Sequence, residues 1–203
     1  MAKLIAVVAP SGVGKTSLVR ALAQAAPFAT ALEQHAERPF QMLFNSNAQY
    51  GLANQVDYLI LRAEQENALR ANPRTALVDG GLDLDYHGFT RLFHRRGLLS
   101  DGEFDLCRRL YELLRALLPP PDLIIRLRAS REVAAQRLAG RQRVNIATAS
   151  DFELFESQLD DWLATLPPAQ ILTVDVSTHD PAYSKLIPGL LDELQTRLGI
   201  VLS

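Results

Sequence analysis

The chain has 203 residues, enough for one α/β domain with a buried core and short for two. It carries 21 Lys and Arg against 23 Asp and Glu, so no excess of cations drives binding to a nucleic acid polymer or an anionic membrane surface. One cysteine, Cys107, excludes an intrachain disulfide and fits a reducing compartment, with the cytoplasm as the default. The apolar N-terminal run is too short for a signal peptide or a membrane span.

Five short apolar runs predict strands, and helical patterns fall between them. Most of the runs lack polar alternation, which is typical of strands buried on both faces of a parallel sheet. Strands that alternate with helices predict a doubly wound α/β fold, in which ligands bind at the carboxyl ends of the strands. The predicted strands are Leu4 to Ala9, Phe28 to Glu33, Thr75 to Asp79, Asp122 to Leu127 and Ile171 to Asp175.

Two Ser-x-x-Glu pairs predict capping boxes at helix starts, Ser100 with Glu103 and Ser150 with Glu153. Cys107 falls on the apolar face of the first of these helices and is interpreted as a core thiol. In the second helix, helical spacing of the apolar residues indicates core packing rather than a cofactor site. These residues are Phe152, Phe155, Leu159, Trp162, Leu163 and Leu166.

Residues 9–16, Ala-Pro-Ser-Gly-Val-Gly-Lys-Thr, follow a predicted strand and open a predicted helix, as a phosphate-binding P-loop requires. Glycines let successive backbone N–H groups turn toward phosphate oxygens, and the helix N-terminus adds positive potential. The first position of the motif is Ala9 instead of glycine, and alanine resists a positive φ. The alternative is an ordinary glycine-bearing turn. The predicted nucleotide-binding residues are Ser11, Gly12, Val13, Gly14, Lys15, Thr16 and Ser17.

A magnesium site is predicted where the third strand ends. Asp79 closes that strand on the same rim as the P-loop, so its carboxylate and the Thr16 hydroxyl are the predicted Mg²⁺ ligands. The alternative is a turn aspartate, since Gly80 and Gly81 follow.

Two arginine clusters stand out in the sequence. Arg137, Arg141 and Arg143 predict a lid over residues 137–150 that closes on the transferring phosphoryl group, with a solvated basic face as the alternative. The second cluster is Arg91, Arg95 and Arg96, for which surface charge is the simpler interpretation and a cation near the phosphate the alternative.

Together with these motifs, the Gly-Leu-Leu-Ser-Asp-Gly-Glu run at 97–103 and the Pro-Asp-Leu-Ile-Ile-Arg-Leu-Arg-Ala-Ser run at 121–130 show a family resemblance. From Leu4 to about Leu198 the chain resembles the deoxynucleoside kinases. The resemblance implies one P-loop kinase domain over 1–203, with a five-stranded parallel sheet, helices on both faces and an Arg-bearing lid. It implies transfer of the γ-phosphoryl group of ATP, with Mg²⁺, to the 5′-hydroxyl of a nucleoside or deoxynucleoside. By analogy, a homodimer through the helices around 83–99 or 101–118 is expected.

The resemblance also implies roles for residues on the acceptor side. Glu33 falls where the family has the general base for the 5′-hydroxyl, and Gln55 where a side-chain amide binds the base. Arg62 and Asp85 match a base-site ion pair, and Phe89 matches a stacking aromatic. The implied catalytic residues are Glu33, Lys15, Arg137, Arg141 and Arg143, and the implied substrate residues are Glu33, Phe44, Gln55, Arg62, Asp79, Asp85 and Phe89.

Three positions depart from the family pattern. Gly80 replaces an arginine near the 5′-hydroxyl, Phe44 replaces a tyrosine that holds the sugar 3′-hydroxyl, and Ile146 replaces a lid glutamate. Loss of these partners predicts weaker discrimination for the sugar hydroxyl.

Two other functions are open on the sequence. A nucleoside monophosphate kinase would need cations for the acceptor phosphate, and the region after Glu33 offers only His35 and Arg38. A nucleotide-binding homologue without transfer activity is the other alternative. The base cannot be read from the sequence, because an amide such as that of Gln55 pairs with several base edges.

Overall fold

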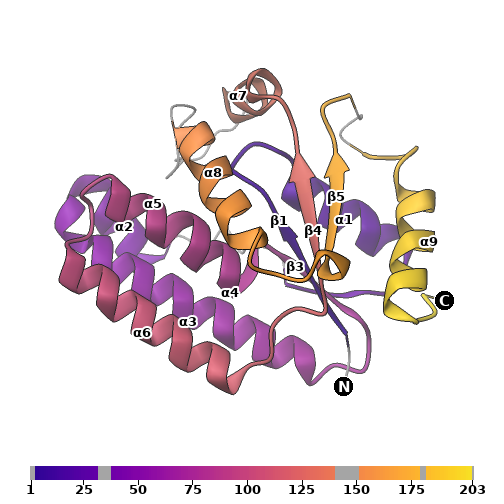
Figure 1. Cartoon of the computed structure of the whole chain (residues 1–203), viewed down its shortest axis with the longest axis horizontal. Coiled ribbons are helices and arrows are strands. Elements are labelled where there is room, and N and C mark those ends of the chain that lie inside the picture. Colours follow the sequence, from indigo (N-terminus) through magenta and orange to yellow (C-terminus); the bar gives the residue numbers. More distant parts are fainter. Residues whose placement is uncertain (1–2, 32–37, 140–150, 179–181, 203) are drawn as a thin grey trace.

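The computed structural model describes residues 3–31, 38–139, 151–178 and 182–202. Its centre is a parallel sheet of five strands in the order β2-β3-β1-β4-β5 (Figure 1). The strands are β1 (Leu4–Val8), β2 (Ala29–Ala31), β3 (Ala76–Asp79), β4 (Leu123–Arg128) and β5 (Ile171–Asp175). All five predicted strands are therefore confirmed. The central strands are buried on both faces, whereas β5 at one edge is half exposed.

Helices cover both faces of the sheet (Figure 1). The α-helices are α1 (Lys15–Ala25), α2 (Pro39–Ser46), α3 (Gly51–Arg70), α4 (Gly81–Leu84), α5 (Arg91–Arg95), α6 (Asp101–Leu117), α7 (Arg131–Ala139), α8 (Phe152–Leu163) and α9 (Ile187–Leu198). The described ranges also contain the short helical turns η1 (Ala48–Tyr50), the π-helical η2 (Asp85–Thr90) and η4 (Pro168–Gln170). In the described part of the chain, no helix is both long and apolar enough to cross a lipid bilayer.

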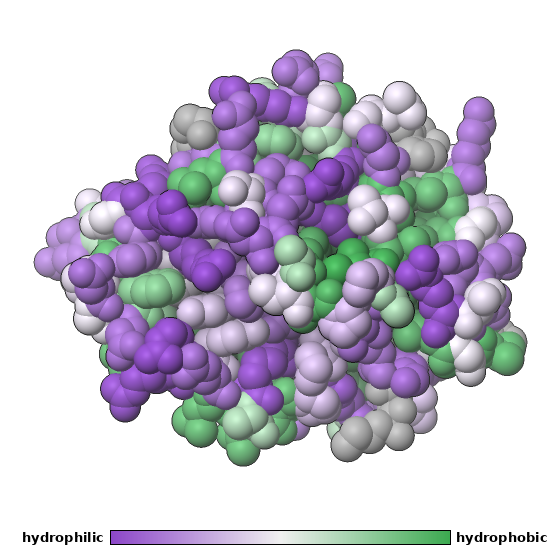
Figure 2. Space-filling model, in the orientation of Figure 1, coloured by the Kyte–Doolittle hydropathy of each residue, from purple (hydrophilic) through white to green (hydrophobic). Residues whose placement is uncertain are grey.

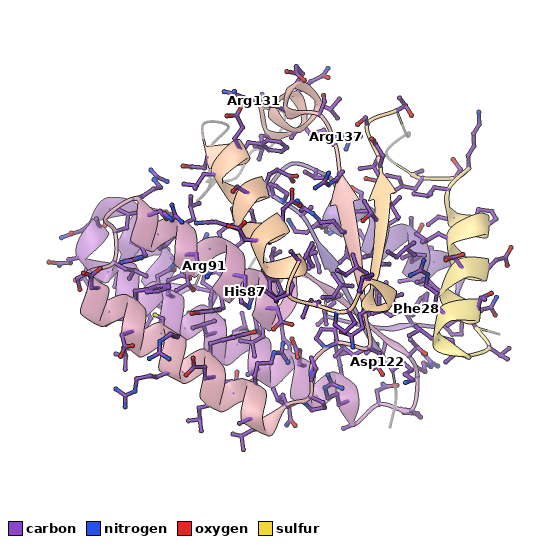
Figure 3. All side chains as sticks on the ribbon, in the orientation of Figure 1. Phe28, His87, Arg91, Asp122, Arg131 and Arg137 are labelled. Atoms are coloured by element: carbon purple, nitrogen blue, oxygen red, sulfur yellow. The ribbon has the colours of Figure 1, made fainter. Side chains whose placement is uncertain are left out.

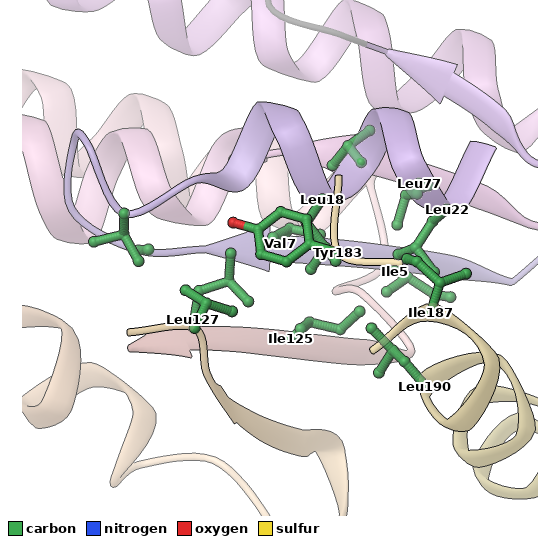
Figure 4. Packing of buried hydrophobic residues seen from close by; sticks show 14 of the residues in the cluster. Ile5, Val7, Leu18, Leu22, Leu77, Ile125, Leu127, Tyr183, Ile187 and Leu190 are labelled. Carbon is green, nitrogen blue, oxygen red and sulfur yellow. The ribbon is translucent and has the colours of Figure 1, made fainter. Parts of the chain in front are cut away.

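Successive residues of the central strands face opposite layers, as the pleat requires. On one face, Ile5 and Val7 pack with Leu18 of α1 and Ile187 of α9 (Figure 4). On the other face, Ala6 and Val8 pack with residues of α8, including Phe155, Leu159 and Trp162. The apolar spacing in α8 is thus core packing, as predicted.

A third apolar cluster lies between α3, α6 and η2, beside the sheet. Cys107 is fully buried there, and burial raises the pKa of its thiol to about 11, so it is a core thiol as predicted. The capping box that opens α6 is confirmed: the Ser100 hydroxyl accepts from the Glu103 N–H, and the Glu103 carboxylate accepts from the Ser100 N–H. Ser150, the start of the second expected box, lies outside the described residues.

Candidate active site

The P-loop connects the end of β1 to the start of α1, and its glycines take left-handed conformations. Gly12 has φ +86° and Gly14 has φ +118°. Tyr183 is the one non-glycine residue with a positive φ in the described ranges, so Ala9 takes an ordinary conformation and its departure from glycine brings no strain. Lys15 Nζ donates to the carbonyl oxygens of Ala9 and Pro10, at 2.9 and 3.2 Å. The ammonium group is therefore held at the loop, where phosphate oxygens bind in such motifs.

Two side chains from distant segments hold the backbone of this loop. Arg137 on α7 donates to the carbonyl oxygens of Val13, at 2.6 Å, and Val176, at 3.1 Å (Figure 3). The buried Tyr183 hydroxyl donates to the Gly14 carbonyl at 3.4 Å, and Figure 4 shows its ring in the core beneath α1. Sequence reasoning assigned Arg137 to the lid and missed Tyr183 altogether, because no local motif marks a residue so distant in sequence from the loop.

The two predicted metal ligands are in contact. The Thr16 hydroxyl donates to Asp79 Oδ2, and Asp79 is buried at the end of β3. This oxygen-only donor pair fits Mg²⁺, which binds proteins through one or two oxygen ligands and completes its shell with water and phosphate oxygens. Over the described ranges, no group of three or more His, Cys, Asp or Glu side chains converges on a point, so a dedicated all-protein metal cage is not seen there.

The predicted base-site residues form one buried cluster between α3 and η2. Arg62 Nε donates to Asp85 Oδ2 at 2.6 Å, and each side chain of this pair is 7% exposed. The Thr90 hydroxyl donates to Gln55 Oε1 at 2.8 Å and to the Asp85 carbonyl at 3.0 Å. Thr90 thereby joins the amide to the ion pair, a connection that the sequence did not reveal. Residues from positions 55 to 90 thus make one buried polar cluster.

The two predicted aromatic residues contact other rings instead of each other. Phe89 packs edge-on against Phe155 of α8, with ring centroids 4.9 Å apart. Phe44 on α2 stacks on Phe93 of α5 at 5.0 Å. Both positions have an apolar neighbour that fixes the ring, as a contact surface for a flat ligand requires.

A second buried ionic network lies next to this cluster, and sequence reasoning missed it. Arg115 of α6 donates to both carboxylate oxygens of Glu66 at 2.9 Å and to those of Asp83 at 2.8 and 3.1 Å. Burial raises the pKa of the Asp83 carboxyl, and Arg115 opposes that shift. Glu66 also accepts from the Leu82 N–H at 3.0 Å, so the network holds the start of α4 just after Asp79.

Gly80, one of the positions that depart from the family pattern, and its neighbour Gly81 form a turn with an unusual backbone. Gly80 and Gly81 have φ +90° and +83°, a conformation that residues with a Cβ rarely adopt. A Cβ on Gly80 would lie 3.1 Å from Leu84 Cδ2, and one on Gly81 would lie 3.2 Å from Glu66 Oε1. The second arginine cluster supplies no replacement cation here: Arg96 pairs with Asp151 at 3.3 Å, and Arg91 and Arg95 line a separate cavity.

Four of the predicted site positions lie outside the described residues. They are Glu33, Arg141, Arg143 and Ile146. Their roles in proton acceptance, lid closure and sugar contact remain predictions.

A lysine-bearing phosphate loop at the carboxyl end of a parallel sheet is typical of P-loop phosphotransferases. The profile of the deoxynucleoside kinase family matches residues 5–187. The chain therefore belongs to the deoxynucleoside kinase family and is a nucleoside kinase, in agreement with the resemblance in the sequence.

The chain is similar to curated members of this family over most of its length. It is 28% identical to a deoxyguanosine kinase of Bacillus subtilis (strain 168) over 195 residues, 91% of each chain. It is 21% identical to a deoxyadenosine/deoxycytidine kinase of the same organism, over 87% of this chain and 84% of that one. Structures of deoxyadenosine kinase from M. mycoides superpose with a TM-score of 0.78 at 16% identity, covering 95% of this chain and 99% of that chain. The P-loop kinase fold is thus confirmed.

Proposed function

We propose that the protein transfers the γ-phosphoryl group of ATP, with Mg²⁺, to the 5′-hydroxyl of a deoxynucleoside. One observation carries the proposal. The Thr16–Asp79 contact at the P-loop and the buried cluster of Gln55, Arg62 and Asp85 are joined by the short segment that runs from Asp79 through α4 to Asp85. A donor side and an acceptor side built on one segment suit direct phosphoryl transfer.

On the donor side, the backbone amides of residues 11–17 and the start of α1 bind the phosphates of ATP. Lys15 neutralises β- and γ-oxygens once a phosphate displaces its two carbonyl partners. Thr16 and Asp79 hold Mg²⁺, which neutralises charge on the phosphates when bound.

On the acceptor side, Gln55 binds the base edge, and the Arg62–Asp85 pair supports it. Phe89 and Phe44 contact the flat base and the sugar. Glu33 accepts the proton of the 5′-hydroxyl, and Arg141 and Arg143 close over the transferring group, with Arg137 fixing the loop beneath them.

The structure gives no support to a nucleoside monophosphate kinase. Such an enzyme needs free cations for the acceptor phosphate. Arg38, which follows the second strand, makes a two-point ion pair with Asp57 and is therefore already neutralised. The departure at Ala9 gives no support to a nucleotide-binding homologue without activity, because Ala9 has no positive φ and is not strained.

The test is ATP-dependent phosphorylation of the common deoxynucleosides, ribonucleosides and their monophosphates. We expect transfer to at least one deoxynucleoside, with a rate at least about 100-fold lower in Lys15→Ala, since Lys15 supplies transition-state charge stabilisation. Lys185→Ala, which removes an exposed lysine elsewhere, is the matched control and should keep the wild-type rate. Unchanged transfer in Lys15→Ala, or preferred transfer to a monophosphate, would reject the proposal.

We further propose that the protein is a cytoplasmic homodimer of single-domain chains. Of the two helical regions expected to form the dimer, α6 exposes large apolar side chains, Leu106, Leu113 and Leu117. Sedimentation velocity at several protein concentrations tests this, and a monomer at all of them would contradict it.

A further inference from the structure

A cavity of about 410 Å³ lies between α5, α6 and α8, apart from the P-loop. It is large enough for a small-molecule ligand. Figure 3 shows two of its lining residues, His87 and Arg91, near the lower end of α8. The η2 turn supplies Asp85 and Phe89 to the proposed acceptor side and His87 to this cavity, so the two sites lie on opposite sides of one turn.

The cavity contains a buried amide without partners. Gln158 of α8 lines it and is 3% exposed, yet neither its Oε1 nor its Nε2 makes a hydrogen bond with any described residue. Buried side-chain amides nearly always have partners, because an unpaired one forfeits its hydration. A donor and an acceptor thus lie side by side on a residue of the cavity wall, without partners among the described residues.

His87 adds a bare acceptor to the same cavity. The Tyr111 hydroxyl donates its proton to Asp83 Oδ1 at 2.7 Å. In its second contact, 3.1 Å from His87 Nε2, the Tyr111 oxygen must therefore be the acceptor. Nε2 therefore carries the imidazole proton. Burial lowers the pKa of His87 to about 3, which keeps the ring neutral and leaves Nδ1 as an acceptor. Nδ1 is buried and has no partner among the described residues.

The charged groups at the cavity favour an anion. Arg91 and Arg95 lie one turn apart on α5, and neither forms an ion pair within the described ranges. His94 is paired with Asp101 at 2.8 Å. Asp161 is the one carboxylate at the cavity in the described part of the chain, so two unpaired cations face one anion. Figure 2 shows mostly hydrophilic side chains on this part of the face.

We propose that this cavity is a second ligand site, for an anionic small molecule with a flat hydrogen-bonding edge, the chemistry of a nucleoside monophosphate. Arg91 and Arg95 would bind the phosphate, and the Gln158 amide would pair with the base edge. His87 Nδ1 would accept from an N–H or hydroxyl of the ligand, and Trp162 supplies an apolar wall. The proposal does not depend on which acceptor the kinase phosphorylates.

Trp162 gives a direct readout, because it is the single tryptophan of the chain and lies in the cavity wall. Titration with deoxyadenosine monophosphate should change Trp162 emission saturably, whereas deoxyadenosine or inorganic phosphate alone should bind at least tenfold more weakly. Gln158→Leu, and Arg91→Ala with Arg95→Ala, should each weaken the monophosphate by tenfold or more. Arg109→Ala removes an exposed arginine of α6 outside the cavity and should bind like the wild type.

Circular dichroism and thermal unfolding of each variant check that it folds. Lys15→Ala should keep the Trp162 response, so the failure of phosphoryl transfer and the failure of this site are distinguishable. An unchanged titration in Gln158→Leu would overturn the proposal, as the signal would then come from the kinase site. A second result would also overturn the proposal. If Trp162 emission without ligand depends on protein concentration, and the variant with both arginines replaced no longer dimerises, a second copy of the chain covers the cavity.

Discussion

Gly12 is fixed by what packs over it. A Cβ at this position would lie 2.6 Å from the Ala134 carbonyl and 2.7 Å from Leu138 Cγ, both on α7. The positive φ adds a second restriction on side chains. Gly12 therefore has two structural roles: it shapes the anion-binding loop, and it allows α7 to pack directly against that loop.

We predict that Gly12→Ala destabilises the protein by about 1–3 kcal/mol, because alanine would be strained at this φ and would also displace α7. Urea unfolding measures this, and ATP binding should weaken in parallel. Gly102→Ala is the control: nothing lies within 4 Å of its Cβ, so a gain of up to about 1 kcal/mol is expected in helix α6. Equal unfolding midpoints for Gly12→Ala and the wild type would contradict the argument.

Single residues of the site were predictable where a local motif or a family resemblance marks them. Thr16 and Asp79, the predicted Mg²⁺ ligands, contact each other, and Arg62 and Asp85 form the expected ion pair. The ties from Tyr183 and from Arg137 to the loop backbone were not predictable, because they depend on tertiary packing. No sequence pattern encodes which side chain will reach a carbonyl group more than 100 positions away.

At the scale of elements, α6 is the helix whose start was most clearly encoded. Ser100 and Glu103 form the predicted box, and their mutual hydrogen bonds lower the pKa of the Glu103 carboxyl. The folded state therefore favours ionised Glu103. The stability this gives is present above the ordinary pKa of glutamate and is lost as the pH falls through the lower, folded value.

We predict that Ser100→Ala lowers the free energy of unfolding by about 1 kcal/mol at neutral pH, because the first turn of α6 loses a cap. The difference between the two proteins should shrink in acid, once Glu103 is protonated in both. Chemical denaturation across pH measures it. Ser157→Ala, at an exposed position inside α8, should leave stability unchanged or slightly higher. A loss of the same size in Ser157→Ala would show that the cap is not the cause.

The segment from α4 to α5 was the hardest element to predict. Its π-helical turn η2 lies among buried residues from α3, α6 and α8, and its start is held by Glu66 through the Leu82 N–H. Such a turn is set by tertiary contacts and not by helix propensity. The strands were easier to predict, because a short apolar run between turn signals is compatible with few structures other than a buried strand.

For the whole molecule, the partly buried His87 links stability to pH. It stacks on Trp162 at 4.8 Å, and burial, followed by the charges of Arg91 and Arg115, lowers its pKa to about 3. Below the ordinary pKa of 6.5, His87 binds a proton in the unfolded chain but stays neutral in the folded chain. Folding is thus favoured fully above that value and progressively less as the pH falls toward the folded pKa.

We predict that His87→Gln flattens this acid dependence. In the wild type, the lowered pKa of His87 makes the free energy of unfolding fall with pH by up to about 1.4 kcal/mol per pH unit between roughly pH 6 and 4. Unfolding in urea at several pH values compares the two slopes. Identical slopes would mean that His87 is protonated in the folded protein and would contradict its lowered pKa.

The glycine pair after Asp79 has a consequence for how this chain could change over generations. An arginine at position 80 would meet a left-handed backbone and the side chain of Leu84, so the substitution would be strained. Gly81 imposes the same barrier beside it, with Glu66 as the obstructing neighbour. A side chain at either position therefore strains the backbone, and a compensating change at Leu84 or Glu66 would relieve only the crowding. Selection should keep glycine at both positions in any sequence that keeps this backbone.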